Sequence, residues 1–200
     1  MGVAASVKAD IGVFPVSAIP YVTSRILNID MGITTATFFC SLVIFQAILL
    51  RKNFKILSLF QILVASLFGY FVSFCNSLLR FDAPEFYPWR IILHTLGILL
   101  LSFGVMLYLA ASIVPQPPEG VLLAINQISG WRVSTLKIVF DCSLVIICLI
   151  ISSIFMGTPL YGIREGTIMA AVGIGYGMSI FNRLFLKGLT AFMFQSKPPP

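Results

Sequence analysis

Long apolar segments separated by short polar connections dominate the chain. Each segment is continuously apolar rather than alternating, and each is long enough to cross a bilayer, which takes about 20 residues of α-helix. A transmembrane β-barrel would need shorter segments of alternating polarity. The pattern therefore predicts an all-α polytopic membrane protein with five full transmembrane helices. These are Met31–Leu50, Ile56–Leu79, Ile91–Val114, Val133–Met156 and Gly166–Leu186.

The apolar stretch at the start of the chain is too short to cross a membrane. Met1–Val7 is followed at once by Lys8 and Asp10, whereas a signal peptide carries basic residues before a longer apolar core. We interpret this stretch as the end of a truncated first helix, shortened either in this chain or through a misplaced start codon. The C-terminal tail, residues 190–200, ends in three prolines and is expected to be disordered.

The composition agrees with a membrane location. Of the 200 residues, 58% are hydrophobic and 10% are charged, against roughly 25% charged residues in an ordinary globular domain. This excludes a nucleic-acid-binding module, a secreted disulfide scaffold and a soluble enzyme, although the net charge is +6. The basic residues stand singly at the ends of apolar segments, and their distribution places the C-terminus on the cytoplasmic side.

The two halves of the chain resemble each other in sequence. Cys40–Ile44 is repeated as Cys142–Ile146, 102 positions later, and the glycine, tyrosine, serine and asparagine of Gly69–Asn76 recur in Gly175–Asn182, 106 positions later. We interpret the halves as two repeats, residues 1–79 and 88–189, within a single transmembrane domain of residues 1–200. Because each repeat holds three spans, the second must be inverted in the membrane, an arrangement common in secondary transporters.

Each repeat also contains a short apolar segment that proline interrupts. The two segments are Ile11–Ile29 and Ile113–Gly130. Proline is favourable at the first position of a helix, so we expect short helices that start just after Pro15 and Pro117 and end near Asn28 and Gly130. Such segments at matching positions indicate a transporter's binding site. They fit either re-entrant half-helices or amphipathic helices that lie at the interface.

Three stretches of the chain carry motifs of a known family. Val7–Pro15 is similar to the motif K-A-[DN]-L-G-x-x-P, and Thr23–Gly32 to LS-x-x-TG-[IL]-x-x-G, with Asn28 where glycine is usual. Pro117–Ala124 is similar to GPRDGLMLAL, with Pro118-Glu119 replacing Arg-Asp. These motifs resemble the YczE/YitT-like family of bacterial integral membrane proteins. The resemblance covers nearly the whole chain and implies a multi-pass protein of the bacterial inner membrane, but no activity.

Polar residues within the apolar segments are candidates for a solute or ion path. Asp141 lies well inside a span, four residues after Lys137, so it either pairs with that lysine or faces a central cavity as a ligand for a proton or cation. Amides such as Gln46 and Gln61 either join helices or contact a solute. The candidate path residues are Asp10, Pro15, Ser17, Asn76, Pro117, Glu119, Asn126, Gln127, Lys137, Asp141 and Asn182.

The remaining sequence features do not predict catalysis. His94 is the only histidine, and no catalytic triad, carboxylate pair or metal-ligand spacing can be assembled. Gly173 and Gly177 predict close helix packing rather than a nucleotide loop. We expect neither an enzyme nor a bound cofactor or metal.

We therefore expect a transporter for a small solute or ion. Its partners would be the lipid bilayer and a small polar or ionic solute, and we expect no nucleic acid among them. Converging N-termini of the two short helices would favour a polar or anionic solute. A cation would suit the site if Asp10 and Glu119 already satisfy those helix ends. The alternative is a non-transporting scaffold or regulator that binds a partner protein.

Overall fold

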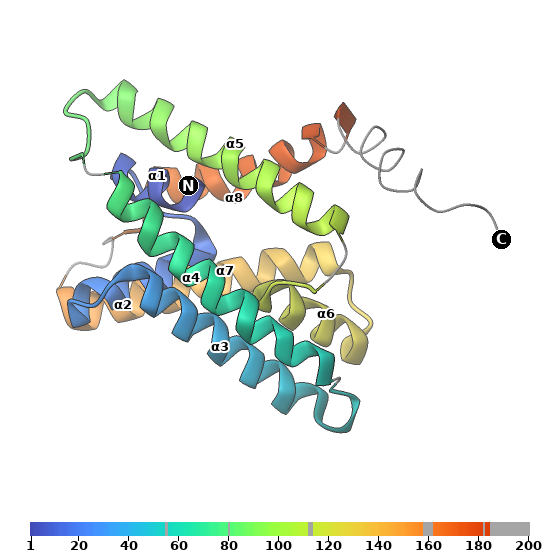
Figure 1. Ribbon diagram of the computed structural model, residues 1–200. Helices are drawn as coiled ribbons and strands as arrows, with labels where there is room; N and C mark the ends of the chain where they lie inside the picture. The colour runs from blue at the N-terminus through green and yellow to red at the C-terminus, as the bar shows by residue number, and fades with distance from the viewer. Residues whose placement is uncertain (55, 80, 112–113, 158–161, 182, 185–200) are drawn as a thin grey trace.

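The computed structural model describes residues 1–54, 56–79, 81–111, 114–157, 162–181 and 183–184. Within these residues the chain is helical throughout, with eight α-helices, two short 3-10 helices and no strand (Figure 1). The α-helices are α1 (Gly2–Ala9), α2 (Pro15–Leu27), α3 (Met31–Leu50), α4 (Phe60–Leu78), α5 (Tyr87–Ala111), α6 (Pro117–Ser129), α7 (Val133–Met156) and α8 (Glu165–Phe181). The 3-10 helices η1 (Arg51–Asn53) and η2 (Ile56–Leu59) connect α3 to α4.

Four of the described helices are long and apolar enough to cross a membrane. They are Met31–Asn53, Phe60–Leu78, Tyr87–Tyr108 and Thr135–Met156. The fifth predicted span begins as α8, which has 17 residues, and its remainder falls mostly outside the described residues. The predicted disordered tail, residues 190–200, also lies outside them. The all-α class is confirmed, whereas the predicted count of five spans is not.

The two short helices α2 and α6 have the bounds that the sequence predicts. Each has 13 residues and a proline at its first position, preceded by an extended residue. α2 ends at Asn28 with φ 56°, and α6 ends at Gly130 with φ 70°. Both ends adopt the left-handed conformation that terminates a helix and that glycine and asparagine tolerate best.

Packing between distant segments ties the helices together. α2 lies against α7, α6 lies against α3, and α5 contacts both α1 and α8 (Figure 1). α3 and α4 form a tight antiparallel pair in which a Cβ on Gly69 would be only 2.5 Å from the carbonyl oxygen of Gly32. Gly173 and Gly177 contact Ile98 and Ser102 of α5, which confirms the packing role predicted for these glycines.

An apolar cluster brings the starts of the two short helices close to the same core. Val121 of α6 is fully buried with Phe39 of α3 and Ala65 of α4, and Val16 of α2 packs against this cluster. The two helix starts therefore approach each other through hydrophobic side chains rather than through a polar pocket.

Candidate functional site

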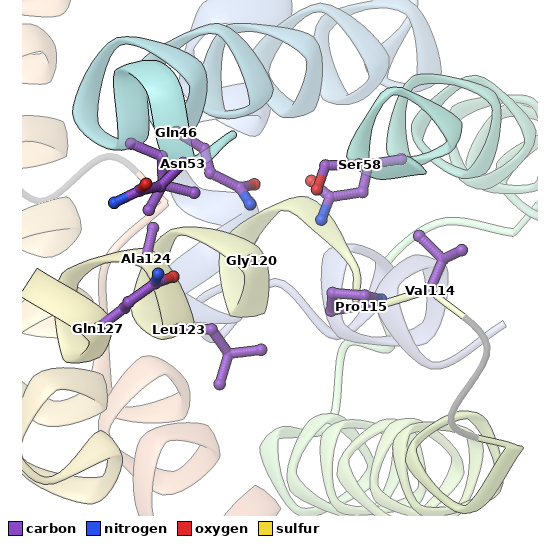
Figure 2. Close-up of a pocket in the computed structure, with 11 residues that line it drawn as sticks. Gln46, Asn53, Ser58, Val114, Pro115, Gly120, Leu123, Ala124 and Gln127 are labelled. Atoms are coloured by element: carbon purple, nitrogen blue, oxygen red, sulfur yellow. The ribbon is translucent and has the colours of Figure 1, made fainter. Parts of the chain in front are cut away.

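A cavity of about 280 Å³ lies at the C-terminal end of α3, between that helix, the start of α4 and one face of α6. Figure 2 shows Gln46 and Asn53 on one side of it and Val114 and Pro115 on another, with Leu123 and Gln127 contributed by α6. The wall combines amides and one hydroxyl with apolar side chains. Its lining residues are Gln46, Leu50, Asn53, Ser58, Gln61, Val114, Pro115, Gly120, Leu123, Ala124 and Gln127.

Two buried glutamines give this cavity its chemical character. Gln61 is 0% exposed and Gln46 is 5% exposed. Among the described residues, neither carboxamide atom of Gln61 has a hydrogen-bond partner, nor does Oε1 of Gln46. An unpaired buried polar group costs about 1–3 kcal/mol, so three such atoms in one place are a substantial local destabilisation. A ligand with donors and acceptors would remove it.

Gly120 allows both glutamines to reach this position. A Cβ on residue 120 would be 2.6 Å from Gln46 Oε1 and 2.7 Å from Gln61 Nε2, so any larger residue would displace the two carboxamides from their present positions. Gly120 lies one turn after Pro117, where its own N–H bonds to the carbonyl oxygen of Gln116. The α6 backbone therefore forms part of the cavity wall.

The loop between α1 and α2 meets the loop before α8 in a closed arrangement. The N–H of Val13 donates to the carbonyl oxygen of Gly162 at 3.0 Å, and that of Gly166 donates to Ile11 at 2.8 Å. Gly12 has φ 121°, and a Cβ there would be 2.7 Å from Thr167 Oγ1. Direct backbone contacts hold this junction closed, whereas unpaired amides line the cavity beside α6.

Charged groups surround this closed junction. Asp10 forms an ion pair with Arg90 at 3.1 Å, and its carbonyl oxygen accepts a bond from Arg164. Glu165 accepts a bond from the Tyr87 hydroxyl. The backbone N–H at the helix start, followed by Tyr87 and Arg164, lowers the pKa of Glu165, so this carboxyl stays ionised near neutral pH.

A second cavity, of about 400 Å³, lies at the opposite end of α3, and its wall includes charged residues of both signs. Two of the predicted path residues, Asp10 and Asn76, line it together with Lys8 and Arg25. Asn76 Nδ2 contacts the sulfur of Met31 at 3.7 Å, and its Oδ1 is buried without a partner among the described residues. This cavity thus contains one unpaired amide oxygen, against three unpaired atoms at Gln46 and Gln61.

The predicted path residues are distributed over several parts of the molecule. Only Gln127 lines the cavity beside α6. Pro15, Pro117 and Ser17 are buried in the first turns of the two short helices. Asn126 donates to the carbonyl oxygen of Trp131 and so stabilises the end of α6. Asn182 lies outside the described residues.

Three of the four ionisable candidates, Glu119, Lys137 and Asp141, gather between α6 and α7. Lys137 and Asp141 form an ion pair at 3.0 Å, which is the first of the two alternatives that their spacing allowed. Glu119, in the first turn of α6, interacts electrostatically with both of them, and its Oε2 is buried with no partner among the described residues. These three residues are not part of the cavity wall.

Gln46 and Gln61 were recognisable in the sequence as amides within apolar spans, but they were not among the predicted path residues. Their signal is the rarity of glutamine in such segments. Gly120 was visible only as a glycine near a proline. The sequence could not show that these three residues meet, because they come from three different helices.

The fold and the cavity define the class of the protein. Membrane-length apolar helices joined by short connections make it an integral, multi-pass, all-α membrane protein. The chain belongs to a family of unknown function, DUF6198, whose model matches residues 1–183. It is also similar to the "Uncharacterized membrane protein YczE" of Bacillus subtilis (strain 168), with 26% identity over 165 residues that cover 82% of this chain and 71% of the relative. No solved structure matches the chain significantly.

Proposed function

We propose that this protein is a transporter for a small solute and that the cavity beside α6 is its solute site. The observation that carries the proposal is the pair of buried carboxamides of Gln46 and Gln61, which lack partners and face a cavity. Polar groups in an apolar span are costly and are retained where they have a function. A solute that pairs with them would stabilise the site by replacing the missing hydrogen bonds.

Two inverted repeats are part of this proposal. α2 and α6 have equal lengths and start 102 positions apart, and α3 and α7 also start 102 positions apart. Two sets of packing pairs correspond as well: α2 lies on α7 while α6 lies on α3, and α2 contacts α8 while α6 contacts α4, although the close pair of α3 and α4 has no such counterpart among the described parts of α7 and α8. These paired contacts support a two-fold relation between the halves, which is the usual build of secondary transporters.

Equivalent positions in the two halves differ in whether they open to a cavity or are closed by contacts, as alternating access requires. With the same offset of 102, cavity residues Gln46 and Ala124, which are 5% and 2% exposed, correspond to Cys148 and Val22, which are both 0% exposed and line neither of the two cavities. Offset by 106, Gln61 corresponds to Thr167, which packs against Gly12 in the closed junction. The position beside α6 therefore opens to a cavity, while the equivalent position beside α2 is filled by direct contacts and the second cavity lies next to it. Exchange of these two arrangements would give alternating access to the site.

The distribution of charge suggests the side to which the cavity opens. Arg51 and Lys52, in the connection between α3 and α4, are exposed beside the cavity. Positive residues concentrate in cytoplasmic connections, so we propose that the cavity opens to the cytoplasm and that the C-terminus lies on the same side. For a bacterial protein the membrane would be the inner membrane.

A non-transporting scaffold or regulator is the second candidate. The observation that favours it is the number of large apolar side chains exposed on α4, such as Leu67, Phe71 and Phe74, a face that could bind another membrane protein as well as lipid. A scaffold has no need for two exchanging arrangements, and this difference allows a direct test.

Cysteine labelling at the equivalent positions Ala124 and Val22 tests the proposal. Each is changed to cysteine in a protein whose four native cysteines are replaced by alanine. In reconstituted vesicles, Ala124→Cys should react with a water-soluble thiol reagent while Val22→Cys stays protected. A transported solute should raise the reactivity of Val22→Cys and lower that of Ala124→Cys. If both stay protected under all conditions, the cavity is not an aqueous path and the scaffold replaces the transporter.

A further inference from the structure

We infer that the cavity beside α6 selects an uncharged solute that both donates and accepts hydrogen bonds, with primary carboxamides as the best-matched chemical class. The inference rests on the proposed function for its physiological meaning. The binding site itself follows from the contacts of Gln46, Gln61 and Gly120. It narrows the polar or anionic solute favoured by the helix ends in the sequence to an uncharged one, and differs from the cation that was the alternative.

The first reason for selectivity toward an uncharged solute is the absence of charged side chains from the described wall of the cavity. None of the described residues that line the cavity is an acid, a base or a histidine. An ion that enters a site without an opposite charge loses its hydration and gains no ion pair, which is strongly unfavourable in a low-dielectric environment. The ionisable residues Glu119, Lys137 and Asp141 interact with one another and lie outside this wall. The wall thus disfavours anions and cations alike.

The second reason, which favours a carboxamide, is the set of hydrogen-bond donors and acceptors in the wall. Gln61 presents an unpaired N–H₂ and an unpaired carbonyl oxygen, and Gln46 presents a further unpaired carbonyl oxygen. These atoms are buried beside the cavity, so a ligand meets both donors and acceptors once the two carboxamides turn toward it. A carboxamide matches this set in kind, because its own oxygen accepts while its nitrogen donates. A carboxylate only accepts and an amidinium only donates, so each would leave part of the wall unpaired.

The size of the cavity and its apolar side limit the ligand further. At about 280 Å³ the cavity lies at the lower end of the range for small-molecule sites, roughly 300–1,000 Å³. Leu50, Val114 and Leu123 provide apolar contacts opposite the amides. A short molecule with one or two amide groups on a small carbon skeleton fits both features.

A series of three probes with matched shape tests this inference. Malonamide is neutral, malonamate is its mono-anion analogue and malonamamidinium its mono-cation analogue, and all have the same number of non-hydrogen atoms. Isothermal titration calorimetry of the purified protein in detergent should show malonamide binding about tenfold or more tightly than either ion. Equal or tighter binding of an ion, or no binding of malonamide, would overturn the inference.

Two variants connect the selectivity to the glutamines. Gln61→Leu should weaken malonamide binding about tenfold, and Gln61→Glu should shift the preference to malonamamidinium. If a Gln61 variant fails to fold, Gln46→Leu tests the same contribution of the glutamines to malonamide binding. Gln116→Leu is the matched control, because that glutamine lies outside the cavity wall and should bind malonamide as the unaltered protein does. Malonamide affinity that is unchanged in both Gln61→Leu and Gln46→Leu would place the binding site elsewhere and contradict the inference.

The binding experiment separates this inference from the proposed function. Selective malonamide binding without any solute flux would keep the carboxamide site and remove the transporter. Flux of an ion without malonamide binding would keep the transporter and remove the carboxamide site.

Discussion

The carboxamide of Gln61 lies directly against the α-carbon of Gly120, so that a Cβ on residue 120 would be only 2.7 Å from Gln61 Nε2. The contact joins the start of α4 to the first turns of α6, two segments that are far apart in the chain. It also positions an unpaired amide at the wall of a cavity. The proposed site depends on this close approach of Gln61 to Gly120.

Gly120→Ala should therefore disturb the site more than the fold. The new methyl group would displace the ends of two flexible side chains, Gln46 and Gln61, rather than a backbone atom. We expect malonamide affinity to fall about tenfold, since the amides would no longer occupy their present positions. Calorimetry measures this change. Gly175→Ala is the control, because a Cβ at Gly175 meets nothing within 4 Å, and wild-type affinity in Gly120→Ala would contradict the geometry.

Gln61→Leu should make the ligand-free protein more stable even though it weakens binding. Leucine has a similar volume and removes two buried atoms that lack partners. The free energy of unfolding should rise by about 1–2 kcal/mol, as is common when an unpaired polar group is replaced by an apolar one of similar shape. Thermal or denaturant unfolding in detergent, compared with Gln116→Leu, measures the change. A clear loss of stability would mean that Gln61 is already paired in the protein.

Gly69→Ala should destabilise the pair formed by α3 and α4. Its Cβ would be 2.5 Å from the carbonyl oxygen of Gly32, which belongs to the backbone and cannot move without separating the helices. We expect a loss of about 2 kcal/mol in the free energy of unfolding. Unfolding midpoints should fall for Gly69→Ala and stay near the wild-type value for Gly175→Ala. Equal midpoints for the two variants would contradict the close crossing.

Gly12→Ala should loosen the closed junction. The residue has φ 121°, and its Cβ would be 2.7 Å from Thr167 Oγ1, so both strain and steric overlap oppose the change. Labelling of Val22→Cys should rise severalfold in this background. Gly130→Ala is a matched control: it also replaces a glycine of positive φ, 70°, but with no atom within 4 Å. If both glycine variants leave Val22→Cys equally protected, Gly12 does not hold the junction closed.

Local chemistry made some elements predictable from the sequence. Pro15 and Pro117 fix the starts of α2 and α6, because proline lacks the N–H that would be unpaired there. Asn28 and Gly130 fix the ends, because they tolerate the left-handed conformation. The pair of Lys137 and Asp141 follows from their spacing of four residues on one helix. Each of these features depends on residues that are close together in the chain.

The candidate site could not be predicted in the same way. Gln46, Gln61 and Gly120 come together only when α3, α4 and α6 pack, and hydrophobic periodicity contains no information about their relative rotation. The sequence emphasised charged residues instead. Asp10 and Glu119 interact with charged neighbours in the structure, so the polarity of the cavity comes from neutral amides.

Solute flux through reconstituted vesicles shows whether the cavity beside α6 is a transport site. Proteoliposomes are mixed with an osmotic excess of malonamide in a stopped-flow instrument, and light scattering follows their shrinkage and recovery. If the cavity is a transport site, recovery should be faster than in protein-free liposomes. The acceleration should be largely lost in Gln61→Leu and retained in Gln116→Leu. Recovery at the rate of protein-free liposomes, in a preparation shown by calorimetry to bind malonamide, would contradict the claim that this cavity is a transport site.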